Sequence, residues 1–309
     1  MIDIRENVPL APRTSFHIGG DARFYVEVNS LEELKEALYC AKEKNIDFCI
    51  LGGGTNVLIN DNGFAGIIIK IKISEISAEG TELKASAGAP LIKVINSAVD
   101  AGLSGLEVLA GIPGTLGGAI RGNAGAFGME ISERVESVLA FDFEKFETVT
   151  LGKEECNFEY RSSIFKQNEN LIILSAQFKL AQGRQIEIQQ KIKETIAKRS
   201  SNGLNIFKSA GSYFMNPVVE DEGLLKEFAK TSGTLSKNGK LPAGWLIDRV
   251  GLRGKKIGGA MVSEQHANYI INVGGATADD VMMLVSCVKQ QVRDQLNIQL
   301  QEEVDYLGF

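Results

Sequence analysis

The chain of 309 residues lacks the features that mark membrane, secreted and nucleic-acid-binding proteins. No uninterrupted apolar run approaches the roughly 18 residues of a membrane-spanning helix, so we expect no membrane segment. The opening residues, MIDIRENVPL, have neither the basic nor the apolar region of a secretory signal peptide, which favours a cytoplasmic location. The net charge is −6 and no basic block occurs, so no nucleic-acid partner is expected.

Residues that bind metals or form disulfides are also scarce. The two histidines, His17 and His266, lie far apart in the sequence, so no histidine-rich metal site is expected. The cysteines lack metal-type spacing, and reduced thiols in a cytoplasm are the simplest interpretation. They are Cys40, Cys49, Cys156 and Cys287.

The first third of the chain has the pattern of an α/β module. The composition, 44% hydrophobic and 23% charged, is that of a globular protein with a sizeable core. Ser30 and Glu33 form a capping box that opens an amphipathic helix over residues 31–44. A strand expected to be buried, residues 47–51, runs directly into Gly52-Gly53-Gly54-Thr55-Asn56. A glycine turn at the carboxyl end of such a strand is a usual ligand-binding place.

This triple glycine does not predict a Rossmann dinucleotide site. It lacks the G-x-G-x-x-G spacing, and the VLI that follows continues as a strand rather than a helix. It is better interpreted as a tight loop that presents backbone amides, and a plain strand-to-strand turn is the simpler alternative.

A second module and a smaller C-terminal region follow. Pro90 is placed to open a helix that runs to Gly102. Ser200-Ser201-Asn202-Gly203 is a polar break at which we place a domain boundary. Thr277 is expected to cap a long amphipathic helix near the C-terminus. Further strands are predicted at residues 81–88, 135–143, 146–151 and 171–180, and further helices at 185–199 and 222–230.

The segment AGIPGTLGGAIRGNAGAFG, from Ala110 to Gly128, is the most unusual stretch. Seven of the eighteen residues from Gly111 to Gly128 are glycine. Such a run predicts neither an ordinary helix nor a central strand, because glycine loses backbone entropy and readily adopts positive φ. Free amides in irregular turns bind phosphates. We interpret the segment as a pyrophosphate cradle, and the alternative is a connection between tightly packed elements.

Taken together, several motifs resemble one family. They occur in this order over nearly the whole chain: PLAPRTSFHIGG, LGGGTNVLI, the glycine-rich segment, YRSSIF, GSYFMNP, HANYIIN and the terminal EEV. Together they resemble the shorter subtype of the UDP-N-acetylenolpyruvoylglucosamine reductases, in the family's order. The resemblance implies an α+β and α/β fold. Its FAD-binding module, of the vanillyl-alcohol oxidase type, would span residues 1–200, with subdomains of about 1–72 and 73–200. A smaller α+β substrate domain would span 201–309, and its C-terminal tail would return to the site.

The resemblance also implies the chemistry. NADPH reduces FAD, and the flavin delivers a hydride to the enolpyruvyl double bond of a UDP-sugar, which yields UDP-N-acetylmuramate for peptidoglycan synthesis. Hydride addition beyond a carboxylate builds negative charge as an enolate, so the site needs a cationic or hydrogen-bonding partner and a proton donor. The expected partner is the small-molecule UDP-sugar substrate, and the protein is expected to be a monomer.

The same resemblance assigns the residues. Arg161 is expected to hold the carboxylate, Ser212 to donate the proton, and Glu303 to polarise the carboxyl group, with its neighbour Glu302 as the rival. The substrate would also contact Tyr160, Lys208 and Asn216. The residues expected to bind FAD noncovalently are Gly52, Gly53, Gly54, Thr55, Asn56, Gly111, Pro113, Gly114, Gly117, Gly118, Asn123, Ala124 and Gly128.

Simpler interpretations stay open at this stage. Arg161 could be a structural arginine, Ser212 a loop serine and Glu303 a solvated charge. Tyr213 and Phe214 are candidates to cover the site, because the inserted loop of the longer subtype is absent.

Two other functions and two histidine roles complete the expectations. The rival functions are a flavin oxidase acting on sugars or alcohols and a nucleotide-binding module without catalysis. A covalent flavin link through His17 is conceivable but not expected, because the family binds FAD noncovalently. We expect His266 to be packed and hydrogen-bonded.

Overall fold

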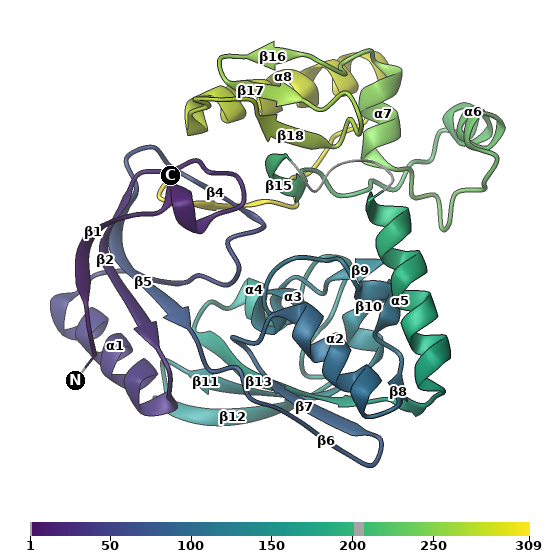
Figure 1. Cartoon of the computed structure of the whole chain (residues 1–309). Helices are drawn as coiled ribbons and strands as arrows, with labels where there is room; N and C mark the ends of the chain where they lie inside the picture. The colour runs from purple at the N-terminus through teal and green to yellow at the C-terminus, as the bar shows by residue number, and fades with distance from the viewer. Residues whose placement is uncertain (1, 201–206) are drawn as a thin grey trace. The chain divides into compact units, whose positions relative to one another are not determined.

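The computed structural model describes residues 2–200 and 207–309 and divides the chain into two compact units (Figure 1). Unit 1 comprises Met1–Val8, Ala22–Gly54 and Ala65–Ser201, and unit 2 comprises Pro9–Asp21, Thr55–Phe64 and Asn202–Phe309. Residues 201–203 of the predicted polar break lie outside the described residues.

The first sheet of unit 1 has the strand order β1-β2-β5-β3 and carries helix α1 (Figure 1). The apolar stripe of α1, which includes Leu34 and Leu38, packs against Val26, Ile67 and Ile69 of the sheet. The predicted helix over residues 31–44 is therefore confirmed. The bounds are β1 Arg5–Pro9, β2 Asp21–Val28, α1 Leu31–Lys44, β3 Phe48–Ile50 and β5 Phe64–Ile71.

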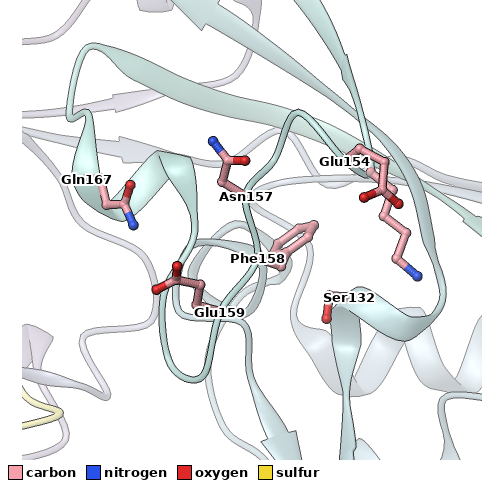
Figure 2. Close-up of a pocket in the computed structure, with 7 residues that line it drawn as sticks. Ser132, Glu154, Asn157, Phe158, Glu159 and Gln167 are labelled. Atoms are coloured by element: carbon pink, nitrogen blue, oxygen red, sulfur yellow. The ribbon is translucent and has the colours of Figure 1, made fainter.

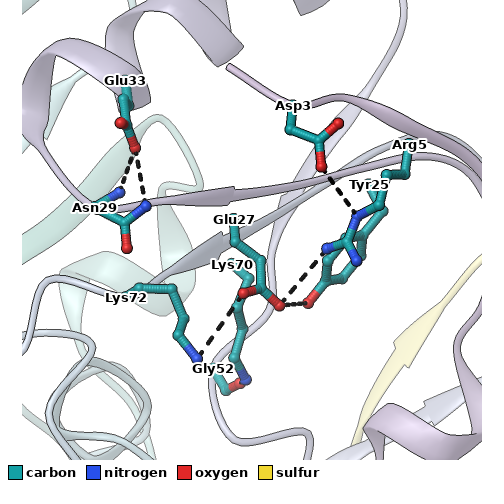
Figure 3. Close-up of polar contacts among 9 residues, drawn as sticks. All are labelled: Asp3, Arg5, Tyr25, Glu27, Asn29, Glu33, Gly52, Lys70 and Lys72. Atoms are coloured by element: carbon teal, nitrogen blue, oxygen red, sulfur yellow. Dashed lines mark hydrogen bonds and ion pairs between the residues drawn. The ribbon is translucent and has the colours of Figure 1, made fainter. Parts of the chain in front are cut away.

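Two local predictions in this part were wrong. The Ser30 hydroxyl accepts a hydrogen bond from the Glu33 amide at 3.1 Å, as expected, but the Glu33 carboxylate accepts from the Asn29 amide at 2.6 Å instead of from Ser30 (Figure 3). The reciprocal bond of the capping box is thus displaced by one residue. The strand after α1, β3, is half-buried rather than buried, because it pairs only with β5 at the edge of its sheet.

The second sheet of unit 1 is antiparallel, with the order β12-β11-β13-β7-β6. Helices α2 and α3 cover one of its faces (Figure 1), and the buried side chains Val94, Ile95 and Leu116 pack onto Leu83 and Phe178. The bounds are β6 Ile76–Glu79, β7 Glu82–Ser86, α2 Leu91–Asp100, α3 Leu116–Arg121, β11 Val135–Asp142, β12 Glu147–Gly152 and β13 Leu171–Lys179.

Short elements complete unit 1. The predicted helix over residues 185–199 is confirmed as α5, and Pro90 is the N-cap of α2 rather than part of its first turn. The remaining elements are β8 Leu103–Ser104, β9 Gly125–Ala126, β10 Met129–Glu130, α4 Ile164–Gln167, β14 Ala181–Gln182 and α5 Gln185–Ser200.

Unit 2 is built on the antiparallel sheet β15-β18-β17-β16 and helices α6, α7 and α8. As predicted, Thr277 caps the long helix α8. Its hydroxyl accepts from the Asp280 amide at 3.0 Å, and the Asp280 carboxylate accepts from the Thr277 amide at 3.2 Å, which completes a capping box. The apolar face of α8, with Leu284, Val285 and Val288, lies in one core with Leu246 and Ile270. The bounds are β15 Lys208–Ser212, α6 Glu222–Ser232, α7 Ala243–Arg249, β16 Lys256–Ile257, β17 Ala260–Val262, β18 Tyr269–Asn272 and α8 Ala278–Leu296.

Segments distant in sequence also belong to unit 2. Strand β4 (Val57–Ile59) pairs in parallel with β19 (Asp305–Leu307), close to the C-terminus. The Ser15 hydroxyl donates to the carbonyl of Ser209 at 2.6 Å, and the Asn272 amide donates to the carbonyl of Phe16 at 3.2 Å. Two segments that lie between strands of the first sheet in the sequence are thus tied to the C-terminal part of the chain.

Candidate active site

The first glycine loop, Gly52–Gly54, follows β3 at its carboxyl end in unit 1. Gly54 has a φ of +67°, which suits glycine and strains other residues. The ammonium group of Lys70, from β5, donates to the carbonyl oxygen of Gly52 and anchors the loop (Figure 3). The sequence analysis missed Lys70 because a single lysine within an apolar strand belongs to no motif.

Part of the glycine-rich segment is helical, contrary to the prediction. Helix α3 begins after Thr115, whose hydroxyl accepts from the Gly118 amide at 3.4 Å. The Gly117 amide donates to the carbonyl of Ala87 at 2.9 Å, which holds the helix against the residue that follows β7. Capping and packing outweigh the low helix propensity of glycine here. The flanking turns are irregular, as expected, and Gly114 has a φ of +112°.

The two glycine-rich stretches lie side by side in unit 1. A Cβ atom built on Gly52 would stand 3.0 Å from the Thr115 hydroxyl oxygen and 3.9 Å from the Cα atom of Gly118. Among the described residues, the amides of Gly52, Gly53 and Gly114 donate to no protein acceptor. Unpaired amides beside small residues allow a phosphate to approach the backbone closely. The residues present therefore fit the diphosphate of FAD.

Arg161 lies in a tight turn of unit 1. The main chains of Glu159 and Ser162 exchange two hydrogen bonds of 3.0 and 3.1 Å, with Tyr160 and Arg161 between them. Arg161 has a φ of +59°, a strained backbone conformation for any residue other than glycine. Residues with such strain are found most often at functional sites. Its guanidinium stands 4.9 Å from the centre of the Tyr160 ring and donates through Nη2 to the Gly125 carbonyl at 3.0 Å.

In unit 2, the structure brings Ser212 and Glu303 to neighbouring segments. The Glu303 amide donates to the carbonyl of Tyr213, which follows Ser212, at 2.8 Å. The Met215 amide donates to the Gln301 carbonyl at 2.9 Å, so residues 213–215 and 301–303 run antiparallel. Ser212 and Glu303, almost a hundred positions apart in sequence, are thus brought to two paired segments of the chain.

Glu302, the rival of Glu303, has a partner of its own. Its carboxylate forms an ion pair with the ammonium group of Lys289, on α8, at 2.8 Å. Both side chains are partly buried, which weakens the screening of the pair by water. This ion pair gives the Glu302 carboxylate a structural role that ties the C-terminal segment to α8.

Tyr213 and Phe214 do not cover a site, as had been considered. They are only 0% and 1% exposed and belong to the core of unit 2. The Asn268 carbonyl accepts from the Tyr213 amide at 2.7 Å, and its side chain exchanges two bonds of 2.9 Å with the Phe214 main chain. Burial raises the pKa of Tyr213 far above its ordinary value, and its hydroxyl bonds that of Tyr306 at 3.1 Å. The sequence could not show that this aromatic pair faces the core.

The other predicted residues have separate settings. The Asn216 side chain accepts from the Ala243 amide at 3.0 Å, at the start of α7. The exposed Lys208 begins β15, opposite Asn272. The Asn56 amide group donates to the Glu303 carbonyl at 3.0 Å, which connects the end of the LGGGTN motif to the C-terminal segment of unit 2.

Three further predicted FAD residues lie in the irregular part of the glycine-rich segment. Gly111 and Gly128 have φ values of +82° and +85°. The Ala124 amide donates to the Ala119 carbonyl at 2.8 Å.

A cavity of about 450 Å³ opens beside the Arg161 turn (Figure 2). Glu159, the first residue of the turn, lines this cavity together with Phe158 and Gln167. None of its lining residues is among the predicted site residues, and the opposing charges of Lys153 and two glutamates single out no ligand.

The prediction that His266 is packed and hydrogen-bonded is confirmed. His266 accepts a hydrogen bond from the Asn268 amide at 3.2 Å and packs edge-on against Tyr269. Burial, together with the charge of Arg253, lowers the pKa of His266. All four cysteines are free thiols. No helix in residues 2–200 and 207–309 is long and apolar enough to cross a membrane.

Comparison with known proteins decides the family. Residues 22–151 match the family model of an FAD binding domain, and residues 202–307 match that of the C-terminal domain of UDP-N-acetylenolpyruvoylglucosamine reductase. The UDP-N-acetylenolpyruvoylglucosamine reductase of Carboxydothermus hydrogenoformans is 41% identical over 307 residues, which cover 99% of this chain and 94% of that protein. The chain belongs to the UDP-N-acetylenolpyruvoylglucosamine reductase family. It is therefore an FAD-dependent oxidoreductase, as predicted.

Other members of the reductase family agree with this assignment. The reductase of Solibacter usitatus is 35% identical over 310 residues, which cover 99% of this chain and 97% of that protein. The crystal structure of the reductase from Thermus caldophilus matches with a TM-score of 0.78 and 31% identity, over 99% of this chain and all of that one. The mixed fold expected from the motifs, with an FAD-binding part and the reductase family's C-terminal part, is confirmed.

Proposed function

We propose that this protein reduces the enolpyruvyl ether of UDP-N-acetylglucosamine enolpyruvate to the lactyl ether of UDP-N-acetylmuramate, with NADPH as the source of the hydride. This step belongs to peptidoglycan precursor synthesis, in the cytoplasm, and the protein works as a monomer. Residues 1–200 form the FAD module and residues 201–309 the substrate domain. FAD held by the two glycine-rich stretches would supply the redox chemistry that carries a hydride from NADPH to the carbon–carbon double bond.

One observation carries the proposal beyond family membership. The hydrogen bond between the Glu303 amide and the Tyr213 carbonyl, 2.8 Å long, joins the segment of the proposed proton donor to that of the proposed carboxylate. A serine hydroxyl is a weak acid in water, so it needs polar groups held close to it to deliver a proton. The pairing of the two segments supplies a fixed place for such groups.

Each catalytic residue has a distinct proposed task. Arg161 binds the substrate carboxylate and stabilises the negative charge that develops there, because its guanidinium is planar and stays charged. Ser212 gives its hydroxyl proton to the carbanionic carbon. Glu303 orients the carboxyl end of the substrate and shares its proton network.

Some of the binding residues serve the substrate and the others serve the FAD cofactor. Tyr160 steadies Arg161 through the ring contact, and Lys208 and Asn216 contact the uridine diphosphate. The FAD diphosphate is held by main-chain amides of the two glycine-rich stretches, from Gly52 to Asn56 and from Gly111 to Gly128. Asn123 and Ala124, whose own amides donate within the protein, line the cofactor site.

The function is tested with the purified flavoprotein. Its visible spectrum reports bound flavin, and NADPH absorbance is followed with and without the enolpyruvyl UDP-sugar. We expect bound flavin and oxidation that depends on that sugar. Flavin with oxygen consumption but no dependence on the UDP-sugar would replace the proposal with the oxidase alternative.

The roles of Ser212 and Arg161 are tested by substitution. A general acid contributes about 10²–10⁴-fold to rate, so Ser212→Ala should lower kcat by that factor with little change in KM. Ser286→Ala, at an exposed serine of α8, is the matched control and should retain wild-type kinetics. Arg161→Lys should raise KM, because it keeps the charge and loses the two-pronged grip on a carboxylate. Unchanged kcat in Ser212→Ala would remove Ser212 from the mechanism.

A further inference from the structure

Asn123 is a buried polar residue whose side chain is satisfied within the protein. It is 0% exposed and has a φ of +41°. Its amide nitrogen donates both to the Glu130 carboxylate and to the Glu159 carbonyl, each at 2.8 Å, and its amide oxygen accepts from the Ser132 main chain at 3.3 Å. Both amide hydrogens thus have acceptors, and a buried, fully bonded amide is held in one orientation.

The contacts of Asn123 reach both parts of the Arg161 turn. Its side chain bonds the carbonyl of Glu159, where the turn begins. Its own carbonyl accepts from Nη1 of Arg161 at 3.4 Å, while the Gly125 carbonyl accepts from Nη2 at 3.0 Å. One residue therefore fixes the turn's main chain and also contacts the guanidinium at its tip.

The turn needs such support, because its geometry is unfavourable by itself. Arg161 holds a φ of +59°, a strained conformation that persists only where surrounding contacts impose it. Asparagine tolerates positive φ better than most residues, so Asn123 fits the neighbouring strained position with little penalty. The paired turn and its anchor form one preorganised element.

We propose that Asn123 is the positioning residue of Arg161: its side-chain amide fixes the turn, and its carbonyl orients the guanidinium toward the substrate carboxylate. The assignment of the carboxylate to Arg161 rests on the proposed function, whereas the linkage of the two residues rests on the contacts described. Loss of the Asn123 side chain leaves Arg161 present and charged but free to leave its binding orientation.

The test is a pair of substitutions in the holoenzyme. Asn123→Gly removes the side chain and keeps a backbone that accepts positive φ, so it avoids most of the folding risk of Asn123→Asp, which would set a second carboxylate beside Glu130. We expect kcat/KM to fall about 10–100-fold with FAD content per chain unchanged. In the Arg161→Ala background, Asn123→Gly should cause less than about a twofold further loss, because Arg161 is no longer there to be positioned.

Asn157→Gly is the matched control. Asn157 also has positive φ, +43°, but it is exposed and lines the neighbouring cavity. Its substitution should leave kcat/KM within about twofold of wild type. Losses that multiply in the double variant, or a loss of bound FAD in Asn123→Gly, would overturn the proposal, because Asn123 would then act independently of Arg161.

Failure of the proposed reaction leaves the linkage testable. If the wild type does not reduce the enolpyruvyl UDP-sugar, the urea midpoints of the same four proteins replace the kinetics. The two contacts couple Asn123 and Arg161 physically, so the midpoint loss of the double variant should be smaller than the sum of the single losses. Additive midpoint losses would contradict the linkage whatever the substrate is.

Discussion

Two adjacent glycines of α3 offer a sharp test of the FAD cradle, because the same substitution meets different surroundings at each. A Cβ on Gly117 would stand 3.0 Å from the Cβ and 3.2 Å from the carbonyl oxygen of Ala87. A Cβ on Gly118 would have the Thr115 hydroxyl oxygen as its nearest atom, at 3.7 Å, which is ordinary contact. Both residues lie within α3, so Gly→Ala brings each the same gain in helix propensity.

The magnitudes follow from these distances. In apoprotein, Gly118→Ala should be as stable as wild type or more stable by up to about 1 kcal/mol, the difference in propensity between alanine and glycine. Gly117→Ala should lose about 1–3 kcal/mol to overpacking, partly offset by the same propensity gain. At roughly 2–4 °C per kcal/mol, the melting temperatures of the two variants should differ by several degrees.

For Gly118→Ala, we expect FAD affinity to fall although stability does not. If the diphosphate approaches the α3 backbone, a methyl group on Gly118 blocks it, and FAD affinity should fall at least tenfold, about 1.4 kcal/mol, without loss of stability. The assay is a titration of apoprotein with FAD, followed by flavin fluorescence, beside thermal unfolding of the same samples. Wild-type FAD affinity in a stable Gly118→Ala variant would refute the cradle assignment.

Three further outcomes test other parts of the structure. Burial lowers the pKa of His266, so the unfolded chain binds a proton at this imidazole at a higher pH than the folded protein does. The stability conferred by neutral His266 is therefore complete above about pH 6.5 and declines as the pH falls. Urea unfolding of the His266→Gln variant should depend less on pH between 7 and 5 than that of the wild type. Lys289→Met should lower the free energy of unfolding by about 1 kcal/mol, because the partly buried Glu302 carboxylate loses its partner, and adding Glu302→Gln should restore part of that loss in urea titrations. Burial raises the pKa of the Cys156 thiol to about 11. An alkylating reagent at pH 8 should therefore leave this thiol unmodified in native protein and modify it in urea. Modification at equal rates in both states would contradict the burial of Cys156.

The sequence was sufficient where a signal is local. Ser30 and Thr277 precede apolar residues at helical spacing, and both helices begin after these caps in the structure. The ordered motifs identified the family and its FAD-binding part because each keeps its residue types together in one short stretch. Local chemistry and hydrophobic period are properties of neighbours in the chain, so they can be read without coordinates.

Only the tertiary structure decided which distant residues meet. Helix α3 forms in a glycine-rich run because Ala87 and Thr115 hold its amides. Tyr213 faces the core rather than a site because Asn268, more than fifty residues later, fixes the main chain around it. Lys70 supports Gly52, and Asn123 reaches Arg161, across separations that no sequence period encodes. Such contacts depend on how sheets and turns pack, and packing is settled by the whole chain at once.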